Sequence, residues 1–143
     1  MVTWKTNVET AHTVLIISDQ PESAASWSTL FNQRNCIVLS ESKRSDAVQS
    51  ARLMDPSLLV VDIQLGKAER SEFLQELRAV SHGPILMLIS ANTVDEIIEA
   101  NHAGADECLV KPVNPAVLVI KAMAWLGRSH RIEPVSHQVS VTL

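Results

Sequence analysis

The sequence lacks several features that mark membrane, exported and metal-binding proteins. No apolar run approaches the roughly 20 residues that a membrane span needs, and residues 1–12 are polar, without a stretch typical of a signal peptide. The only cysteines, Cys36 and Cys108, lie inside apolar runs, which favours buried thiols over a disulfide or a zinc site. We therefore expect a cytoplasmic chain that makes no membrane contact.

Basic residues are too few to indicate a nucleic-acid-binding surface. The net charge is −4 and the pI is ≈ 5.7, so we expect no DNA binding by this chain alone. Glycines number only four, and the first apolar run is followed by Ser18-Asp19-Gln20-Pro21 instead of a glycine-rich phosphate loop. The five histidines show no metal-ligand spacing. These absences disfavour an enzyme or cofactor-binding protein, which is the third interpretation of the sequence.

Short apolar runs alternate with segments of helical period along the chain. In 143 residues this alternation predicts one α/β domain with a parallel sheet. The expected strands are residues 14–17, 37–39, 58–62, 85–89 and 108–110, and the expected helices are residues 21–35, 45–55, 71–80, 93–102 and 114–126. The helical spacing predicts three sets of core residues, namely Ala25, Leu30 and Phe31; Val48, Ala51 and Leu53; and Phe73, Leu74 and Leu77.

Polar side chains follow four of the expected strands. Asp19, Asp62, Ser90 and Lys111 each come at or just after the end of an apolar run. Open α/β sheets place their ligand sites at the carboxyl ends of the strands, so these groups should converge on one rim. Two carboxylates, a hydroxyl and an ammonium suit a divalent cation and a phosphoryl group. Taken singly, each residue has an ordinary alternative: a strand-end carboxylate, a helix N-cap, a turn serine or a solvated lysine.

Four segments, taken together, resemble the response-regulator receiver domains of two-component signalling. They are VLIISDQ at 14–20, LLVVDIQLG at 58–66, PILMLISA at 84–91 and GADECLVKP at 104–112, in order and at family spacing. The similarity runs from about residue 13 to 128. It implies the flavodoxin-like receiver fold, a doubly wound five-stranded parallel sheet with strand order 2-1-3-4-5.

The resemblance assigns a role to each residue of the rim. Asp62 would be the phosphoacceptor, and Mg2+ would be held by Asp19, Asp62 and the backbone carbonyl of Gln64. Lys111 would place its ammonium on the phosphoryl oxygens, aimed by a cis peptide bond to the proline that follows it. Ser90 would be the hydroxyl that moves toward the phosphoryl group. The protein would then be a phosphoacceptor switch and not an enzyme, with a sensor histidine kinase as its partner.

Three departures from the family pattern favour an alternative, a phosphorylation-independent pseudo-receiver that acts as a protein-interaction module. Ser18 replaces the first of two adjacent acids, which should weaken Mg2+ binding without abolishing it. Residues 66–70 replace a loop that usually carries a proline, and we expect this loop to be more mobile. Cys108 takes the place of the aromatic residue that usually rotates on activation, and the chain has no tyrosine.

The carboxyl-terminal region resembles the winged-helix transcription-factor subfamily. Residues 114–131 look like its last receiver helix, and residues 131–141 resemble the opening strands of its DNA-binding domain, with a turn at 134–137; the alternative is a polar tail. The chain thus divides into an N-terminal extension (1–12), a receiver domain (13–128) and a tail or the start of a linker or output domain (129–143).

That subfamily dimerises through the fourth helix, fifth strand and fifth helix of the receiver. Asp106 and Lys121 match one of its charge pairs and Arg128 matches another basic position. Apolar residues stand where charges are common; these are Ile97, Ile98 and Val117. We expect a homodimer through this surface. Trp125 either belongs to the surface or packs in the core.

Overall fold

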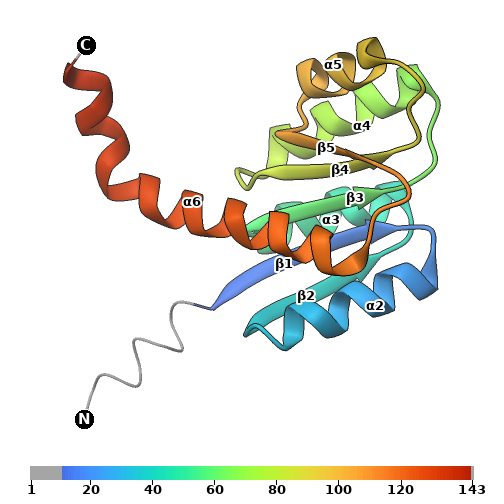
Figure 1. The fold of residues 1–143 in the computed structure, drawn as a ribbon, viewed down its shortest axis with the longest axis horizontal. Helices are drawn as coiled ribbons and strands as arrows, with labels where there is room; N and C mark the ends of the chain where they lie inside the picture. Colours follow the sequence, from blue (N-terminus) through green and yellow to red (C-terminus); the bar gives the residue numbers. More distant parts are fainter. Residues whose placement is uncertain (1–10, 143) are drawn as a thin grey trace.

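The fold is a parallel sheet flanked by helices, and the computed structural model describes residues 11–142 (Figure 1). The strands are β1 (His12–Ser18), β2 (Cys36–Glu41), β3 (Leu58–Asp62), β4 (Ile85–Ile89) and β5 (Glu107–Val110). The helices are α2 (Pro21–Asn32), α3 (Arg44–Met54), α4 (Lys67–Val80), α5 (Val94–Ala103) and α6 (Pro115–Thr142). None of the described helices has the length and apolar character needed to cross a bilayer.

The sheet has the order β2-β1-β3-β4-β5 and every neighbouring pair is parallel, which confirms the predicted topology. The register places Ser18 of β1 beside Asp62 of β3. All five strands therefore end at the same edge, where the polar residues follow them.

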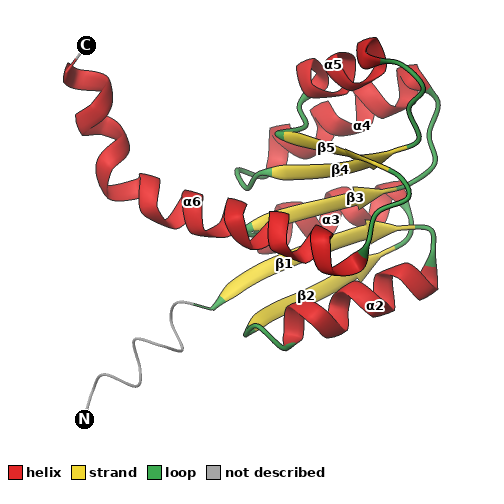
Figure 2. Cartoon of the chain, viewed as in Figure 1, coloured by secondary structure: helices red, strands yellow, loops and turns green. Residues whose placement is uncertain are grey.

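Helices lie on both faces of the sheet (Figure 2). An apolar layer of side chains packs between the sheet and the helices on each face. Side chains alternate along β1, so that Val14 and Ile16 contact the layer containing Trp27 of α2 and Leu118 of α6. The alternate β1 residues contact the layer formed by α3, α4 and part of α5. Because both faces are covered, β3 and β4 are buried along their whole length, as their continuous apolar runs predict.

The helical spacing identified one helix face fully and two only in part. Phe73, Leu74 and Leu77 are buried as predicted. Leu53, by contrast, is 76% exposed, because it lies two residues, or about 200° of helix, beyond the buried Ala51. Ala25 is exposed for the same reason, and Trp27, two residues later, takes the core position.

The last helix is longer than predicted. It begins at Pro115 and buries Leu118, Ala122 and Leu126, but it continues to Thr142. The strands and turn expected within residues 131–141 are therefore wrong for this structure. A helix needs only local hydrogen bonds, whereas an isolated two-stranded hairpin is marginal in water. The helix crosses residue 128, so the domain division there stays a proposal; the expected N-terminal extension lies almost wholly outside the described residues.

Candidate functional site

Asp62 and Lys111 form the centre of the site. Asp62 ends β3 with only 4% of its surface exposed, and its Oδ1 accepts a hydrogen bond from Lys111 Nζ at 2.6 Å. Lys111 directly follows β5, and its peptide bond to Pro112 is cis, as expected. The described residues offer no hydrogen bond to Asp62 Oδ2. The ammonium therefore compensates the buried carboxylate while one oxygen is left for another group.

Asp19 lies beside Asp62 across the β1–β3 pair. Its backbone N–H donates to the Asp62 carbonyl oxygen at 3.4 Å, and its exposed carboxylate Oδ2 accepts from the Gln64 backbone N–H at 3.2 Å. The first helix has Gln20 as its N-cap residue, with no side-chain capping bond. Asp19 is therefore not the helix cap that its position also allowed, and its carboxylate stands at the rim with Asp62.

Ser18 fills the position where the family usually has an acid. It is buried, and its Oγ accepts from the Gln20 backbone N–H at 3.0 Å, which stabilises the turn into α2. Among residues 11–142 there is no cluster of three or more acidic, histidine or cysteine ligands. The donor set is therefore two carboxylates, with the Gln64 carbonyl as the expected third oxygen. Such a set fits Mg2+, which binds through one or two carboxylates and keeps several waters.

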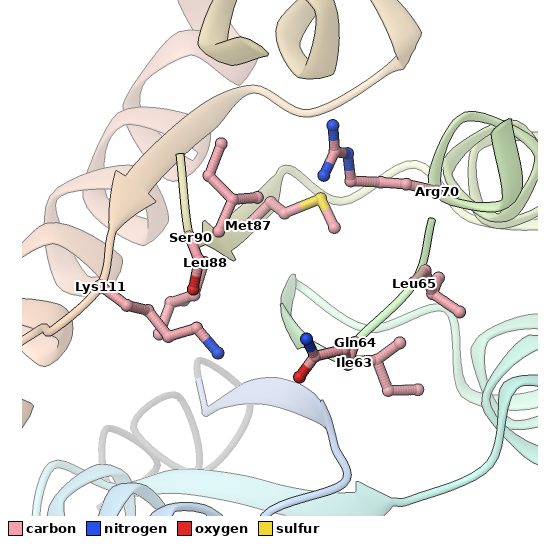
Figure 3. Close-up of a pocket in the computed structure, with 9 residues that line it drawn as sticks. Ile63, Gln64, Leu65, Arg70, Met87, Leu88, Ser90 and Lys111 are labelled. Carbon is pink, nitrogen blue, oxygen red and sulfur yellow. The ribbon is translucent and has the colours of Figure 1, made fainter. Parts of the chain in front are cut away.

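A pocket of ≈ 80 Å³ opens next to these residues (Figure 3). Ser90, which is exposed just after β4, lines it together with Lys111 and Gln64. The remaining lining comes from the β3–α4 connection, the end of β4 and Arg70. The structure thus gathers the predicted Ser90 and Lys111 around one small polar space.

The residue that the sequence analysis missed is Arg70. We expected residues 66–70 to form a mobile loop, but α4 begins at Lys67, and Glu69 Oε1 accepts from the Gly66 backbone N–H at 3.2 Å. That bond stabilises the first turn and makes the loop prediction wrong. It also directs Arg70 into the pocket, with only 14% of its side chain exposed. The sequence signal for this earlier helix start was Glu69, which stands three residues after Gly66.

Cys108 is half-buried and free, as is the buried Cys36. Its Sγ lies 3.6 Å from Asn101 Oδ1, and burial raises the pKa of the thiol. Burial also raises the pKa of Cys36. A raised thiol pKa disfavours the nucleophilic thiolate form. Cys36 is buried as predicted, whereas Cys108 is only half-buried.

The charged residues expected at a dimer surface are paired within the chain. Arg78 donates to Asp106 at 2.7 Å, and Lys121 pairs with Glu107 at 3.2 Å. Trp125 is half-buried, with its Nε1 donating to Glu107 at 2.6 Å and Arg128 lying 3.9 Å over its ring. Trp125 therefore links α6 to β5.

The groups at the rim are suited to the transfer of a phosphoryl group. A carboxylate oxygen, an ammonium and a second carboxylate lie together, and a hydroxyl lines the adjoining pocket. The carboxylate oxygen can act as an acceptor while the cationic groups compensate the charge on a phosphoryl group.

Comparison with known proteins agrees with this arrangement. The family described as response regulator receiver domain matches residues 14–123. A probable transcriptional regulator, ycf27, of Guillardia theta is 28% identical over 131 residues, covering 92% of this chain and 52% of the relative. The transcriptional regulatory protein CpxR of Klebsiella pneumoniae is 30% identical over 119 residues, covering 82% and 50%. The chain thus spans about half the length of these relatives.

Solved structures show the same fold. A two-component response regulator from Clostridium difficile superposes with a TM-score of 0.74 at 21% identity, covering 82% of this chain and 97% of that one. At this sequence identity the structural similarity supports the fold alone.

Proposed function

This chain belongs to the response regulator receiver family, and from that premise we propose that it is a switch that accepts a phosphoryl group on Asp62. The observation that carries the proposal is the Lys111–Asp62 contact of 2.6 Å, which leaves Oδ2 of a buried carboxylate free of hydrogen bonds from the described residues. A sensor histidine kinase, or a small phosphodonor, would supply the group.

The transfer is a displacement at phosphorus. A lone pair of the Asp62 carboxylate forms the new O–P bond, the P–N bond of a phosphohistidine breaks, and its electron pair returns to the imidazole of the kinase. Lys111 holds its positive charge beside the acceptor throughout, and Ser90 lies in the adjoining pocket where its hydroxyl can donate to a phosphoryl oxygen. The step needs positioning and charge compensation more than acid–base chemistry.

Asp19, Asp62 and the carbonyl of Gln64 would hold Mg2+. The ion, when bound, supplies positive charge against the phosphoryl oxygens. Asp19 is already fixed for this role, because its Oδ2 accepts from the Gln64 N–H and its backbone donates to Asp62.

The output of the switch would be a changed interaction surface. We propose that α5, β5 and α6 form a twofold homodimer surface, supported by the exposed apolar residues Val94, Ile98, Val110, Val117 and Ile120. The names of the relatives support control of transcription as the purpose of the whole protein. The proposed compartment is the cytoplasm, where both free thiols stay reduced.

Intact mass after incubation with a small phosphodonor and Mg2+ tests the acceptor. The wild type should gain the mass of one phosphoryl group, and Asp62→Asn should gain none. An equal gain in both proteins would reject Asp62. Asp19→Asn serves as a matched control, because it should slow the reaction without removing the acceptor.

The second candidate is a pseudo-receiver, which Ser18 favours because the rim has two carboxylates where the family usually has three acids. A wild type that gains no phosphoryl mass, yet keeps its fold and self-association, would support this alternative.

A further inference from the structure

Arg70 is a cation that lines the pocket and has few polar partners among the described residues. Its side chain reaches from the first turn of α4 toward Met87, and it lines the same pocket as Ser90 and Lys111 (Figure 3). Only 14% of the side chain is exposed. Within residues 11–142 its guanidinium makes one ion pair, with Glu99 of α5 at 3.6 Å, and no side-chain hydrogen bond. A guanidinium has five N–H donors, so most of its binding capacity is unused.

Glu99 does not depend on Arg70 for charge compensation. Lys67 Nζ lies 2.9 Å from Glu99 Oε2, closer than Arg70. If Arg70 turned away, Glu99 would keep its lysine partner. The cost of losing the 3.6 Å pair is therefore small, since it is longer than a hydrogen bond and partly exposed to solvent.

A phosphoryl group would compete well for Arg70. It carries about −1.5 to −2 charges and three acceptor oxygens, and arginine binds such groups through two parallel N–H bonds. A carboxylate such as Glu99 carries one charge and already has a closer partner. The electrostatic preference of Arg70 should thus reverse when an anion arrives beside Ser90 and Lys111.

We propose that Arg70 is a second cation of the phosphoryl site, which exchanges Glu99 for phosphoryl oxygens and thereby removes one of the two ion pairs that the described residues make between α4 and α5. The inference rests on the proposed function of Asp62 and extends it, because it assigns the link between the site and α5 to an ion-pair exchange. Arg70 positions the phosphoryl group and takes no part in bond making.

Binding of beryllofluoride in the presence of Mg2+, followed by calorimetry, tests the exchange. Arg70→Gln should bind the mimic about 10-fold more weakly, the usual effect of one lost hydrogen bond to a charged group. Arg70→Lys should recover part of the loss. Glu99→Gln should bind about 2- to 5-fold more tightly, because it removes the competitor for Arg70. Arg44→Gln is the matched control: it removes pairs with Glu72 and Glu76 between α3 and α4, and should not change the affinity.

The opposite signs for Arg70→Gln and Glu99→Gln distinguish exchange from a merely structural bridge, which would give both variants the same effect. A second measurement, amide hydrogen exchange in α5, is made in the Asp62→Asn background, where no acyl phosphate forms. Arg70→Gln and Glu99→Gln should each raise exchange there, and Arg44→Gln should not. Equal affinities for all variants, or effects of equal sign, overturn the proposal while leaving the phosphoacceptor intact. A wild type that binds no beryllofluoride and gains no phosphoryl mass overturns the proposed function, and the ion-pair exchange with it.

Discussion

The pairing of Asp62 with Lys111 decides how the site behaves toward substitution. An ionised carboxylate that is 4% exposed is costly without a compensating charge. Lys111, with 35% of its side chain exposed, can be solvated if its partner is neutral. Asp62→Asn should therefore fold normally, whereas loss of the lysine leaves a buried charge unpaired. This asymmetry makes the asparagine variant the better control for phosphorylation experiments.

A first prediction at the residue scale concerns Ser18, whose hydroxyl binds the Gln20 backbone N–H at 3.0 Å beside the two carboxylates. Ser18→Asp adds a negative charge and retains an acceptor for that N–H. It should tighten Mg2+ binding about 3- to 10-fold, because affinity in hard-cation sites follows the number of charged ligands. Calorimetric titration with Mg2+ measures the change.

Ser18→Asn is the matched control, since it has the shape of aspartate without the charge. It should bind Mg2+ close to wild type. Equal tightening by both variants, or no change with aspartate, would remove the missing charge as the explanation.

Residues at strand ends were the most predictable part of the site. Asp19, Asp62, Ser90 and Lys111 follow from where apolar runs stop, because the parallel sheet brings all strand ends to one edge. Gln64 came from the resemblance to the receiver family. Their roles stay proposals, whereas their proximity is a property of the fold. Arg70 could not be found in this way, since its position depends on where α4 begins.

At the scale of elements, helix ends were harder to predict than strand ends. The bond from Gly66 N–H to Glu69 starts α4 four residues before the expected helix. Core faces were read correctly where large residues recur, as in α4, and less well in α3, where small alanines face the core. Helix α6 was misjudged at its far end, because a sequence similarity to strands cannot supply the partner strands that they need.

The end of α3 gives a second prediction. Asp55 stands there with φ 42°, a left-handed conformation that aspartate tolerates better than most residues. Its Oδ1 accepts from the His82 backbone N–H at 3.1 Å and from Ser81 Oγ at 3.3 Å, which ties α3 to the α4–β4 connection. The His82 N–H, more than any other group, holds the pKa of Asp55 below its ordinary value.

A carboxyl group whose pKa is lowered by folding stabilises the native state above its unfolded pKa, and the contribution is lost as the pH falls through the folded value. Asp55→Asn should therefore be less stable than wild type at pH 7, by about 1 kcal/mol or less because the side chain is largely exposed. The difference should shrink below about pH 4. Urea unfolding at pH 7 and pH 3 measures it.

Asp55→Gly separates the backbone from the side chain, since glycine accepts φ 42° but offers no oxygen. At pH 7 this variant should be less stable than wild type, because relief of backbone strain alone does not replace the lost hydrogen bonds. A difference between wild type and Asp55→Asn that is the same at both pH values would contradict a role for the ionised carboxylate.

At the scale of the whole molecule, exposed apolar residues lie both within the proposed dimer surface and outside it. Val94 and Ile98 of α5, Val110 of β5 and Val117 of α6 belong to the proposed dimer surface. Leu53 of α3 is more exposed than Val110 or Val117, yet it belongs to another part of the fold. Ile97, one of the three apolar residues expected at the dimer surface, packs partly against the core instead.

The third prediction joins this surface to the phosphoryl site. Sedimentation at increasing protein concentration, with and without beryllofluoride and Mg2+, should show stronger self-association in the presence of the mimic, because a ligand shifts an equilibrium by its differential affinity for the two states.

Ile98→Lys and Val117→Lys replace half-exposed apolar side chains with charges and should each weaken the dimer at least about 10-fold. Leu53→Lys is the control and should associate like wild type, since its side chain is 76% exposed outside the surface. Self-association that Leu53→Lys weakens as much as Ile98→Lys would place the interface elsewhere. If the mimic binds and no protein changes its association, the site and the surface are uncoupled, and the chain works as an interaction module whose surface does not respond to Asp62.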